Sequence, residues 1–213
     1  MKLAGNELNL SGVVACIDRD NIDTDQIIPT EYLKSIKKYG FEDYLFDGWR
    51  YLDEGKLGIT KDQREINPNF ILNQEPFNKA SILLTRDNFG CGSSREHAVW
   101  ALRDFGIKVV IASSFGDIFY NNCFKNGILP IILDEEKIKE ISEYSNRHEE
   151  IEIDLENQKI FFGNNEIKFE IDPFKKKCLL EGLDDIALSL EKTDKIISFE
   201  KSLKNSKPWI FND

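Results

Sequence analysis

The sequence predicts an α/β protein with parallel core strands, an added antiparallel meander and C-terminal helices. First, two short apolar runs, residues 80–85 and 107–112, enclose a helical pattern, and this order favours a parallel strand pair with a helical crossover. Second, residues 150–172 alternate between apolar and polar side chains, which is typical of antiparallel strands joined by tight turns. Third, helical patterns follow from residue 173 onward. We expect a single domain over residues 1–213, of which 190–213 form a C-terminal helical extension and tail.

The N-terminal part gives weaker patterns. Residues 8–17 are expected to form a strand pair or an edge strand. Residues 31–46 predict one or two short helices that stop near Gly40 and Gly48. Residues 49–73 form a long polar excursion, and loops of this length are often functional or mobile. The excursion is therefore a candidate for ordering when a partner binds.

The middle of the chain gives the clearest helix, over residues 93–106. Its apolar side chains recur at i, i+3, i+4 and i+7, at Ala98, Ala101, Leu102 and Phe105. Gly106 stands where a helix-ending glycine belongs.

The same unit then repeats, with a helix over 114–127 and a strand over 128–133. A charged surface helix is expected over 135–145, and closing helices over 173–182 and 184–204.

Composition limits the classes of function. The chain has 213 residues, 28 basic and 38 acidic side chains, and a net charge of −10. This balance lacks the electrostatic footprint of a nucleic-acid binder and suits an anionic membrane surface poorly. No stretch approaches the roughly 20 apolar residues of a membrane-spanning helix. The N-terminus lacks the apolar region of a secretory signal, so we expect a cytoplasmic protein.

The four cysteines, Cys16, Cys91, Cys123 and Cys178, are far apart and form no C-x-x-C pair. This spacing argues against a disulfide framework and against a zinc or complete iron–sulfur site within this chain. We expect no metal ligands here, and we assign no role to Cys91.

The segment "GCGSSREH", residues 90–97, has two interpretations. The structural one is a helix start. Ser93 and Glu96 have the spacing of a capping box, and Gly90 and Gly92 supply a tight turn.

The functional interpretation uses the same geometry. In parallel sheets, ligands bind beyond the carboxyl ends of the strands, and a helix N-terminus there favours an anion. The hydroxyls of Ser93 and Ser94 and the guanidinium fork of Arg95 suit a carboxylate. The pattern is not G-x-S-x-G, no Lys follows the glycines, and Arg95 stands where a dinucleotide site needs its third glycine.

A long resemblance adds to these patterns. Residues 88–130 ("NFGCGSSREHAVWALRDFGIKVVIASSFGDIFYNNCFKNGILP"), "DNIDTDQIIP" (20–29), "YLFDGWRYLD" (44–53) and "CLLEGLDDIALSL" (178–190) carry it. The chain resembles the swivelling β/β/α domain of the aconitase superfamily, and within it the bacterial small subunits of 3-isopropylmalate dehydratase. The resemblance extends from about residue 13 to residue 190.

The resemblance implies a hydro-lyase that interconverts 2-isopropylmalate and 3-isopropylmalate through isopropylmaleate, in leucine biosynthesis. It implies a heterodimer or higher heteromer with a large subunit, without which this chain is inactive. The [4Fe–4S] cluster is expected on that large subunit, with no cofactor bound by this chain.

Residue by residue, the resemblance implies that Ser93 is the catalytic base. Ser94, Arg95 and Asp25 match residues that bind the substrate. Gly92, Glu96 and His97 are expected to support them, with Glu96 in the capping role.

A specificity segment is a further hypothesis. Relatives that process tricarboxylates carry an arginine in the region of Tyr32, Leu33, Lys34, Ser35 and Ile36, whereas this chain has no Arg from residue 21 to 49. An apolar substrate branch fits that absence, although Lys34 or Lys37 could supply charge. The alternative is that these residues only start a helix, and both interpretations stay open.

Three alternatives to the main hypothesis remain. The first is a related substrate, such as citramalate, citraconate or dimethylmalate. The second is a carboxylate-binding module without catalysis. The third, a serine hydrolase, is disfavoured by the missing nucleophile motif.

Overall fold

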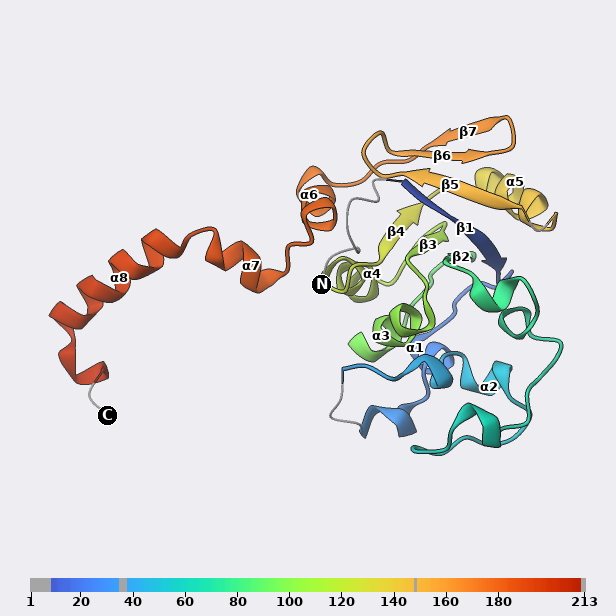
Figure 1. The fold of residues 1–213 in the computed structure, drawn as a ribbon, viewed down its shortest axis with the longest axis horizontal. Helices are drawn as coiled ribbons and strands as arrows, with labels where there is room; N and C mark the ends of the chain where they lie inside the picture. Colours follow the sequence, from blue (N-terminus) through green and yellow to red (C-terminus); the bar gives the residue numbers. More distant parts are fainter. Residues whose placement is uncertain (1–8, 35–37, 148, 212–213) are drawn as a thin grey trace.

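The computed structural model describes residues 9–34, 38–147 and 149–211, and its centre is a mixed seven-stranded sheet (Figure 1). The strands are β1 (Asn9–Cys16), β2 (Ile82–Leu84), β3 (Val109–Ala112), β4 (Leu129–Ile132), β5 (Glu150–Asp154), β6 (Lys159–Phe162) and β7 (Asn165–Lys168). Their order is β4-β3-β2-β1-β5-β6-β7. Strands β1 to β4 pair in parallel, and β5 to β7 form the expected antiparallel meander. The predicted fold class is confirmed.

The prediction that residues 8–17 form an edge strand or strand pair is wrong. β1 lies inside the sheet, between β2 on its parallel side and β5 on its antiparallel side. The neighbouring side chains Val14 and Ala15 point to opposite faces of a strand, and both are buried. Burial on both faces is what an interior strand needs, and a run this short does not reveal it.

The helices surround this sheet. They are α1 (Thr24–Ile27), α2 (Asp47–Arg50), α3 (Glu96–Phe105), α4 (Asp117–Lys125), α5 (Glu135–Ser145), α6 (Pro173–Glu181), α7 (Asp185–Leu190) and α8 (Thr193–Ser206), with short 3-10 helices at Thr30–Lys34, Glu42–Tyr44, Lys61–Gln63, Ile71–Asn73, Phe77–Lys79 and Pro208–Ile210. The expected helices at α3, α4 and α5 are confirmed, and Gly106 ends α3 with φ +114°. The predicted stop at Gly48 is wrong, because Gly48 lies inside α2.

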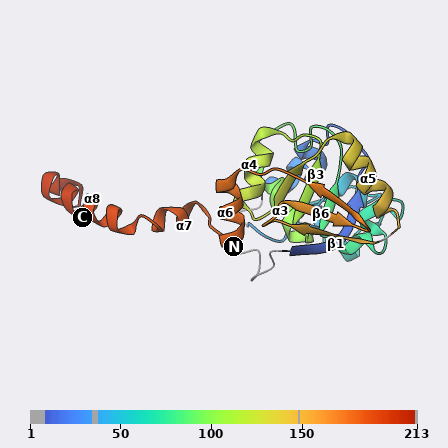
Figure 2. The same cartoon turned by 90° about the horizontal axis from the view of Figure 1, so that it is seen from above.

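The last helices do not close onto the sheet. α7, α8 and the final 3-10 helix extend away from the rest of the molecule as an arm (Figures 1 and 2). The arm, residues 185–211, exposes large apolar side chains, namely Ile186, Leu190, Ile196, Ile197, Phe199, Trp209, Ile210 and Phe211. The helical pattern of α8 is visible in the sequence, but the surface that its apolar side meets is not, which explains the error. No described helix is long and apolar enough to cross a membrane.

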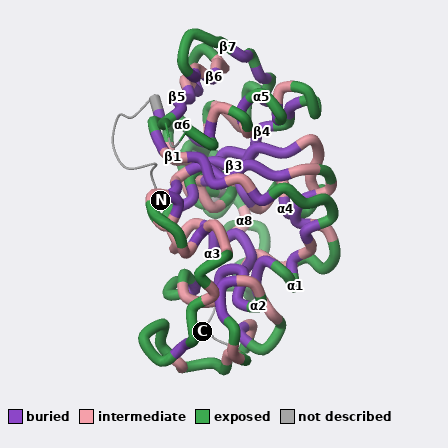
Figure 3. The backbone as a smooth tube through the Cα atoms, turned by 90° about the vertical axis from the view of Figure 1, so that its right-hand side faces the viewer, coloured by how far each residue is buried: buried purple, intermediate pink, exposed green. Residues whose placement is uncertain are grey.

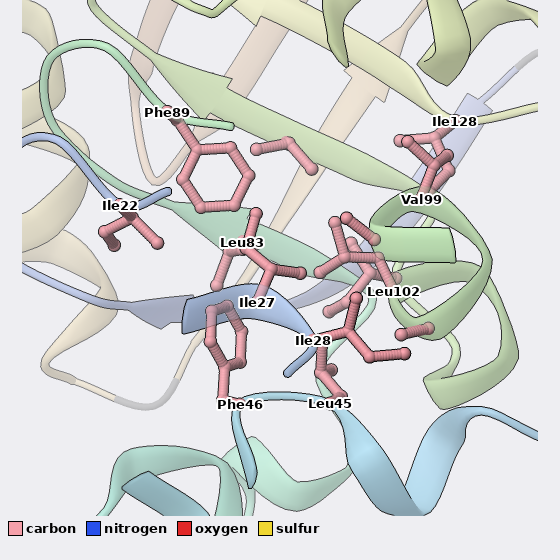
Figure 4. Close-up of a cluster of buried hydrophobic side chains, with 14 of the residues drawn as sticks. Ile22, Ile27, Ile28, Leu45, Phe46, Leu83, Phe89, Val99, Leu102 and Ile128 are labelled. Carbon is pink, nitrogen blue, oxygen red and sulfur yellow. The ribbon is translucent and has the colours of Figure 1, made fainter. Parts of the chain in front are cut away.

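Two hydrophobic cores lie on the two faces of the parallel strands, which run as a buried layer through the molecule (Figure 3). Leu83 points toward one core, which it shares with Leu102 of α3 and Ile27 of α1 (Figure 4). Its neighbour Ile82 points toward the other core, which includes Ile141 of α5. The sheet is therefore covered on both faces, as parallel sheets require.

A buried network of hydrogen bonds joins residues of the 49–73 excursion to Asp47 and Tyr32. The guanidinium of Arg64 donates to Asp47 (Nη1 to Oδ1, 2.6 Å) and to Asp53 (Nε to Oδ2, 2.9 Å). Tyr32 also donates to Asp47, at 3.0 Å. A Cβ at Gly55 would lie 1.8 Å from the Tyr32 hydroxyl, so this close approach needs a glycine. These hydrogen bonds hold the excursion in place within this chain. Its ordering on partner binding stays a prediction.

Deleting residues 192–213, which include most of the arm, should leave the remainder folded. A chain ending at Glu191 loses α8 and the final 3-10 helix, in which no described residue is buried. The ion pair close to the cut joins exposed Lys177 and Glu191, which is worth at most about 1 kcal/mol. We expect the midpoint of urea denaturation to change little, measured by circular dichroism. A loss of several kcal/mol would mean that the arm packs on this chain in solution.

Candidate active site

Three loops at the carboxyl edge of the parallel strands form the site. They follow β1, β2 and β3, and they continue the parallel pairing as isolated bridges, Asp23 with Cys91 and Phe89 with Phe115. The backbone N–H of Gly90 donates to Ile22 O at 2.7 Å. This edge is where ligands bind in parallel sheets, as expected for residues 90–95.

Glycines allow these loops to touch. Gly90 has φ +72° and Gly92 has φ +88°, a conformation that L side chains rarely adopt. A Cβ at Gly90 would lie 2.2 Å from Phe119 Cγ, and a Cβ at Gly116 would lie 2.6 Å from Gly90 O. Residues 90–92 therefore sit directly against the first turn of α4.

The expected capping box is wrong. α3 begins after Arg95, which occupies the N-cap position, and no described side chain caps this end. Instead of returning to Ser93, the carboxylate of Glu96 accepts from Asn126 Nδ2 at 2.9 Å. Ser93 lies in the loop, where its carbonyl accepts from Thr24 Oγ1 at 3.0 Å. The positive end of the α3 dipole is thus left without a side-chain cap, which favours a bound anion.

A cavity of ≈ 250 Å³ opens at this helix end. Its lining residues are Thr24, Gly90, Cys91, Gly92, Ser93, Arg95, Gly116, Asp117, Ile118 and Phe119. The structure therefore brings Ser93 and Arg95 to one cavity, and their roles as base and as binder of the substrate carboxylate stay predictions. Ser94 is exposed but does not line this cavity.

Asp25 lies beside the cavity through its ion pair with Arg95. Arg95 Nη1 donates to Asp25 Oδ1, and Thr30 Oγ1 donates to the same oxygen at 2.6 Å. The hydrogen bond from Arg95, and secondly that from Thr30, hold the pKa of Asp25 below its usual value. The described ion pair uses one end of the guanidinium, which has five donors in all. Asp25 therefore orients Arg95.

His97 packs against aromatic rings. Its ring centroid lies 4.5 Å from that of Trp100 and 5.5 Å from that of Phe41. Burial lowers the pKa of His97 below its usual value of 6.5, so the neutral imidazole dominates at pH 7. These contacts pack His97 against aromatic neighbours at the start of α3. Its supporting role at the site stays a prediction.

Cys91 lines the cavity, and burial raises the pKa of its thiol, with a further contribution from Asp23. The thiol form therefore dominates at neutral pH, and the structure gives it no evident chemistry.

The specificity segment is only partly placed at the site. Tyr32 is fully buried in the network with Asp47, so its side chain is not available to a substrate in this structure. Leu33 packs against the core, and Lys34 is exposed. Ser35 and Ile36 lie outside the described residues. The hypothesis that residues 32–36 form a specificity segment stays a prediction.

Among the described residues, no group of three or more His, Cys, Asp or Glu side chains could hold a metal ion. Cys91 is the one cysteine among the residues described as lining the cavity. The side chains present here do not fit an iron–sulfur cluster, which is held by several thiolates.

Sequence reasoning missed several residues that shape the site. Thr24 is buried and holds the Ser93 carbonyl, and Asn126 joins Glu96 to the Trp100 indole (Nε1 to Oδ1, 2.9 Å). Thr24 stands next to Asp25 in the first motif, which was an available signal. Gly116 and Ile118 belong to the start of a helix whose proximity only the tertiary fold reveals.

Two family models match this chain and place it in the class of aconitase-like domains. A family model described as the aconitase C-terminal domain matches residues 6–136. A second model, described as the C-terminal domain of the 3-isopropylmalate dehydratase small subunit, matches residues 185–213, which include the arm.

Individual relatives narrow this class. A 3-isopropylmalate dehydratase small subunit of Pelagibacter ubique is 64% identical over 205 residues, which are 96% of this chain and 97% of that protein. A protein of the same name from Marinobacter nauticus is 52% identical, over 94% of this chain and 95% of that protein. The crystal structure of a 3-isopropylmalate dehydratase from Methanocaldococcus jannaschii aligns with a TM-score of 0.60 and 30% identity, over 91% of this chain and 99% of that one. The chain belongs to the family of 3-isopropylmalate dehydratase small subunits, as the sequence motifs indicate.

The pair between Arg95 and Asp25 can be tested by titration. In the intact chain, the Asp25 carboxyl should titrate below 3.8. The Arg95→Met substitution should raise that pKa toward 3.8, because the positive charge and its hydrogen bond are removed. Carboxyl chemical shifts measured by NMR between pH 2 and 6 would show this. The control Arg86→Met removes the partner of Asp18 and should leave Asp25 unchanged.

The ion pair between Asp25 and Arg95 makes the stability of the fold depend on pH. Folding lowers the pKa of Asp25, so the pair stabilises the fold above pH 3.8 and this contribution is lost as the pH falls through the lowered pKa. An Asp25 pKa that is insensitive to Arg95→Met would contradict the pairing.

Proposed function

We propose that this chain is the small subunit of a heteromeric hydro-lyase that interconverts 2-isopropylmalate and 3-isopropylmalate through isopropylmaleate, in leucine biosynthesis. The observation that carries the proposal is one cavity lined by both Ser93 and Arg95 at the uncapped N-terminus of α3. The names of the relatives supply the substrate class.

Arg95 is proposed to hold one substrate carboxylate through its guanidinium fork. Asp25 positions Arg95 through their ion pair. The N–H groups at the start of α3 add further donors. Ser94 is exposed outside the cavity lining, and its proposed contact with the substrate is the part of the hypothesis that this cavity does not support.

Ser93 is proposed to act as the base. Its oxygen, as the alkoxide, takes the proton from the substrate carbon next to the carboxylate. The electron pair of that C–H bond forms the new double bond, and the hydroxyl on the neighbouring carbon leaves with a proton as water. Adding water back in the opposite orientation gives the isomer. The α3 dipole and Arg95 lower the free energy of the Ser93 alkoxide, which is the state that an ordinary serine does not reach.

The departing hydroxyl needs an acid. The resemblance assigns that acid to a [4Fe–4S] cluster on the large subunit, and the side chains described here do not fit such a cluster. This chain would therefore supply the base and the carboxylate ligands, and its partner would supply the Lewis acid.

The arm is the proposed contact to the large subunit. Its apolar side chains are exposed in this chain, with Trp209 at 67% and Phe199 at 64%. The family model that matches residues 185–213 takes its name from the small subunit, whereas the model that matches residues 6–136, with strands β1 to β4, takes its name from aconitase. A segment particular to separate small subunits fits a role in joining the two chains.

Ser93→Ala should reduce kcat by at least about a thousandfold in the reconstituted complex, because the proposed general base is lost. Isopropylmaleate formation can be followed by ultraviolet absorbance. Stability should change by less than about 0.5 kcal/mol, since Ser93 is an exposed loop residue and not the cap of α3.

Ser11→Ala is the matched control. Ser11 is an exposed serine near the amino end of β1, at the opposite end of the strand from the site. Full activity in the Ser93→Ala complex would refute the assignment of the base. Full activity of the wild-type chain without its partner would refute the divided site.

Removing residues 192–213 should weaken binding to the large subunit by at least about tenfold in dissociation constant, because several exposed apolar side chains are deleted. Isothermal titration of the two purified proteins would measure it. Unchanged affinity would rule out residues 192–213 as the contact. A wild-type chain that dimerises alone, and a truncated one that does not, would assign the arm to a second copy instead.

A further inference from the structure

Thr24 is a buried residue, 2% exposed, that joins the start of α1 to the loop of Ser93. Its side-chain Oγ1 donates to the Ser93 carbonyl at 3.0 Å, and its backbone N–H donates to the Cys91 carbonyl at 2.9 Å. The next residue, Asp25, pairs with Arg95. Residues 24 and 25 therefore hold alternate residues of this loop, 91, 93 and 95, through three separate bonds.

The two members of a capping box lie in this loop, but they are held apart. Ser93 and Glu96 have the spacing of the box. In the structure the Glu96 carboxylate accepts from Asn126, and the Ser93 carbonyl accepts from Thr24. A capping residue gives its carbonyl to the first bond within the helix, and here Arg95 takes that position instead. The residues that hold the box apart come from elsewhere in the chain, one from α1 and one from the end of α4.

A capped α3 is the competing state of this loop. A serine cap stabilises a helix start, and it would engage the Ser93 hydroxyl with the N–H of Glu96. The uncapped state is favoured only while the bond from Thr24, together with that from Asn126, outweighs the cap. The proposed base needs a serine hydroxyl that faces the substrate, which a capping hydroxyl does not provide.

We propose that Thr24 is a positioning residue for Ser93, because its hydroxyl holds the Ser93 carbonyl and so keeps Ser93 out of the N-cap of α3. The effect on catalysis rests on the proposed function, whereas the effect on the loop does not. Arg95 has a separate ion pair with Asp25, formed through its long side chain. Loss of the Thr24 hydroxyl should therefore act on the proposed base more than on the carboxylate ligand.

Thr24→Val removes the hydroxyl and keeps the shape of the side chain. In the reconstituted complex, kcat for 2-isopropylmalate should fall by at least about thirtyfold, because a small displacement of a catalytic group has effects of this size. KM should change by less than about threefold. Thr24→Ser restores the hydroxyl and should keep kcat within about threefold of wild type.

Thr85→Val is the matched control. Thr85 is 1% exposed, and its Oγ1 donates to the Arg19 carbonyl at 3.2 Å. This variant removes the same kind of buried bond, but one that does not reach the loop of Ser93. The midpoint of urea denaturation should fall by a similar amount in both valine variants, whereas kcat should stay within about twofold of wild type in Thr85→Val.

The isolated chain supplies a second measurement that needs no partner and no activity. Arg95 is now extended, with φ −119° and ψ 104°. If Ser93 enters the N-cap in Thr24→Val, Ser94 and Arg95 become the first helical residues. Their Cα chemical shifts, measured by NMR, should then move toward helical values, and they should stay unchanged in Thr85→Val.

The outcomes separate this inference from the proposed function. Equal kcat in Thr24→Val and Thr85→Val, a Thr24→Ser complex as slow as Thr24→Val, or unchanged shifts of Ser94 and Arg95 would each overturn the positioning role and leave the proposed function intact. A wild-type complex that does not turn over 2-isopropylmalate would refute the proposed function. The chemical shifts would still decide whether Thr24 keeps Ser93 out of the cap.

Discussion

The site depends on backbone pairing that continues past the ends of the parallel strands. Residues 22–24, 89–91 and 114–116 follow three different strands, and hydrogen bonds between them hold the loops side by side. Each bond contributes only about 0.5–1.5 kcal/mol, but together they fix the relative positions of groups far apart in sequence. Asp25, Ser93 and Ile118 face one region because of this pairing. Without it, these side chains would lie on three independently mobile loops.

The start of α3 departs from the rule that a serine with glutamate three residues later caps a helix. A Ser93 cap would add about 1 kcal/mol of helix stability, but it would engage the hydroxyl and one of the amide donors. In the structure Thr24 holds the Ser93 backbone through its carbonyl, and the helix starts two residues later. The Ser93 side chain is then available at the cavity, and the dipole of α3 stays open to an anion. The helix start is therefore less stable than a capped one, and its amide donors stay unsatisfied. Such departures from local rules are common at functional sites.

The sequence was sufficient for the parallel core, because apolar runs and a regular helical stripe recur there with clear boundaries at Gly106 and Gly127. Motif and resemblance also pointed to the loop with Ser93 and Arg95, which lines a cavity in the structure, and the roles of these residues stay predictions. It failed where the answer depends on a partner surface or on long-range contact. The central position of β1 needs pairing with strands more than 60 residues away, and the burial of Tyr32 needs Asp47 and Arg64. The sequence of the arm also does not show that its helices leave the sheet uncovered by them.

The local charges of the cavity favour the proposed division of the site between two chains. The substrate class carries two carboxylates, whereas the cationic side chain of the cavity, Arg95, is already balanced by Asp25. Asp117 adds a further negative charge, and the chain as a whole has a net charge of −10. These groups orient a dianion more than they attract it, because the local charges nearly cancel. On the proposed function, net attraction has to come from the large subunit with its metal centre. What this chain then supplies is geometry: a serine in a loop fixed by backbone pairing, and one guanidinium held in place by Asp25.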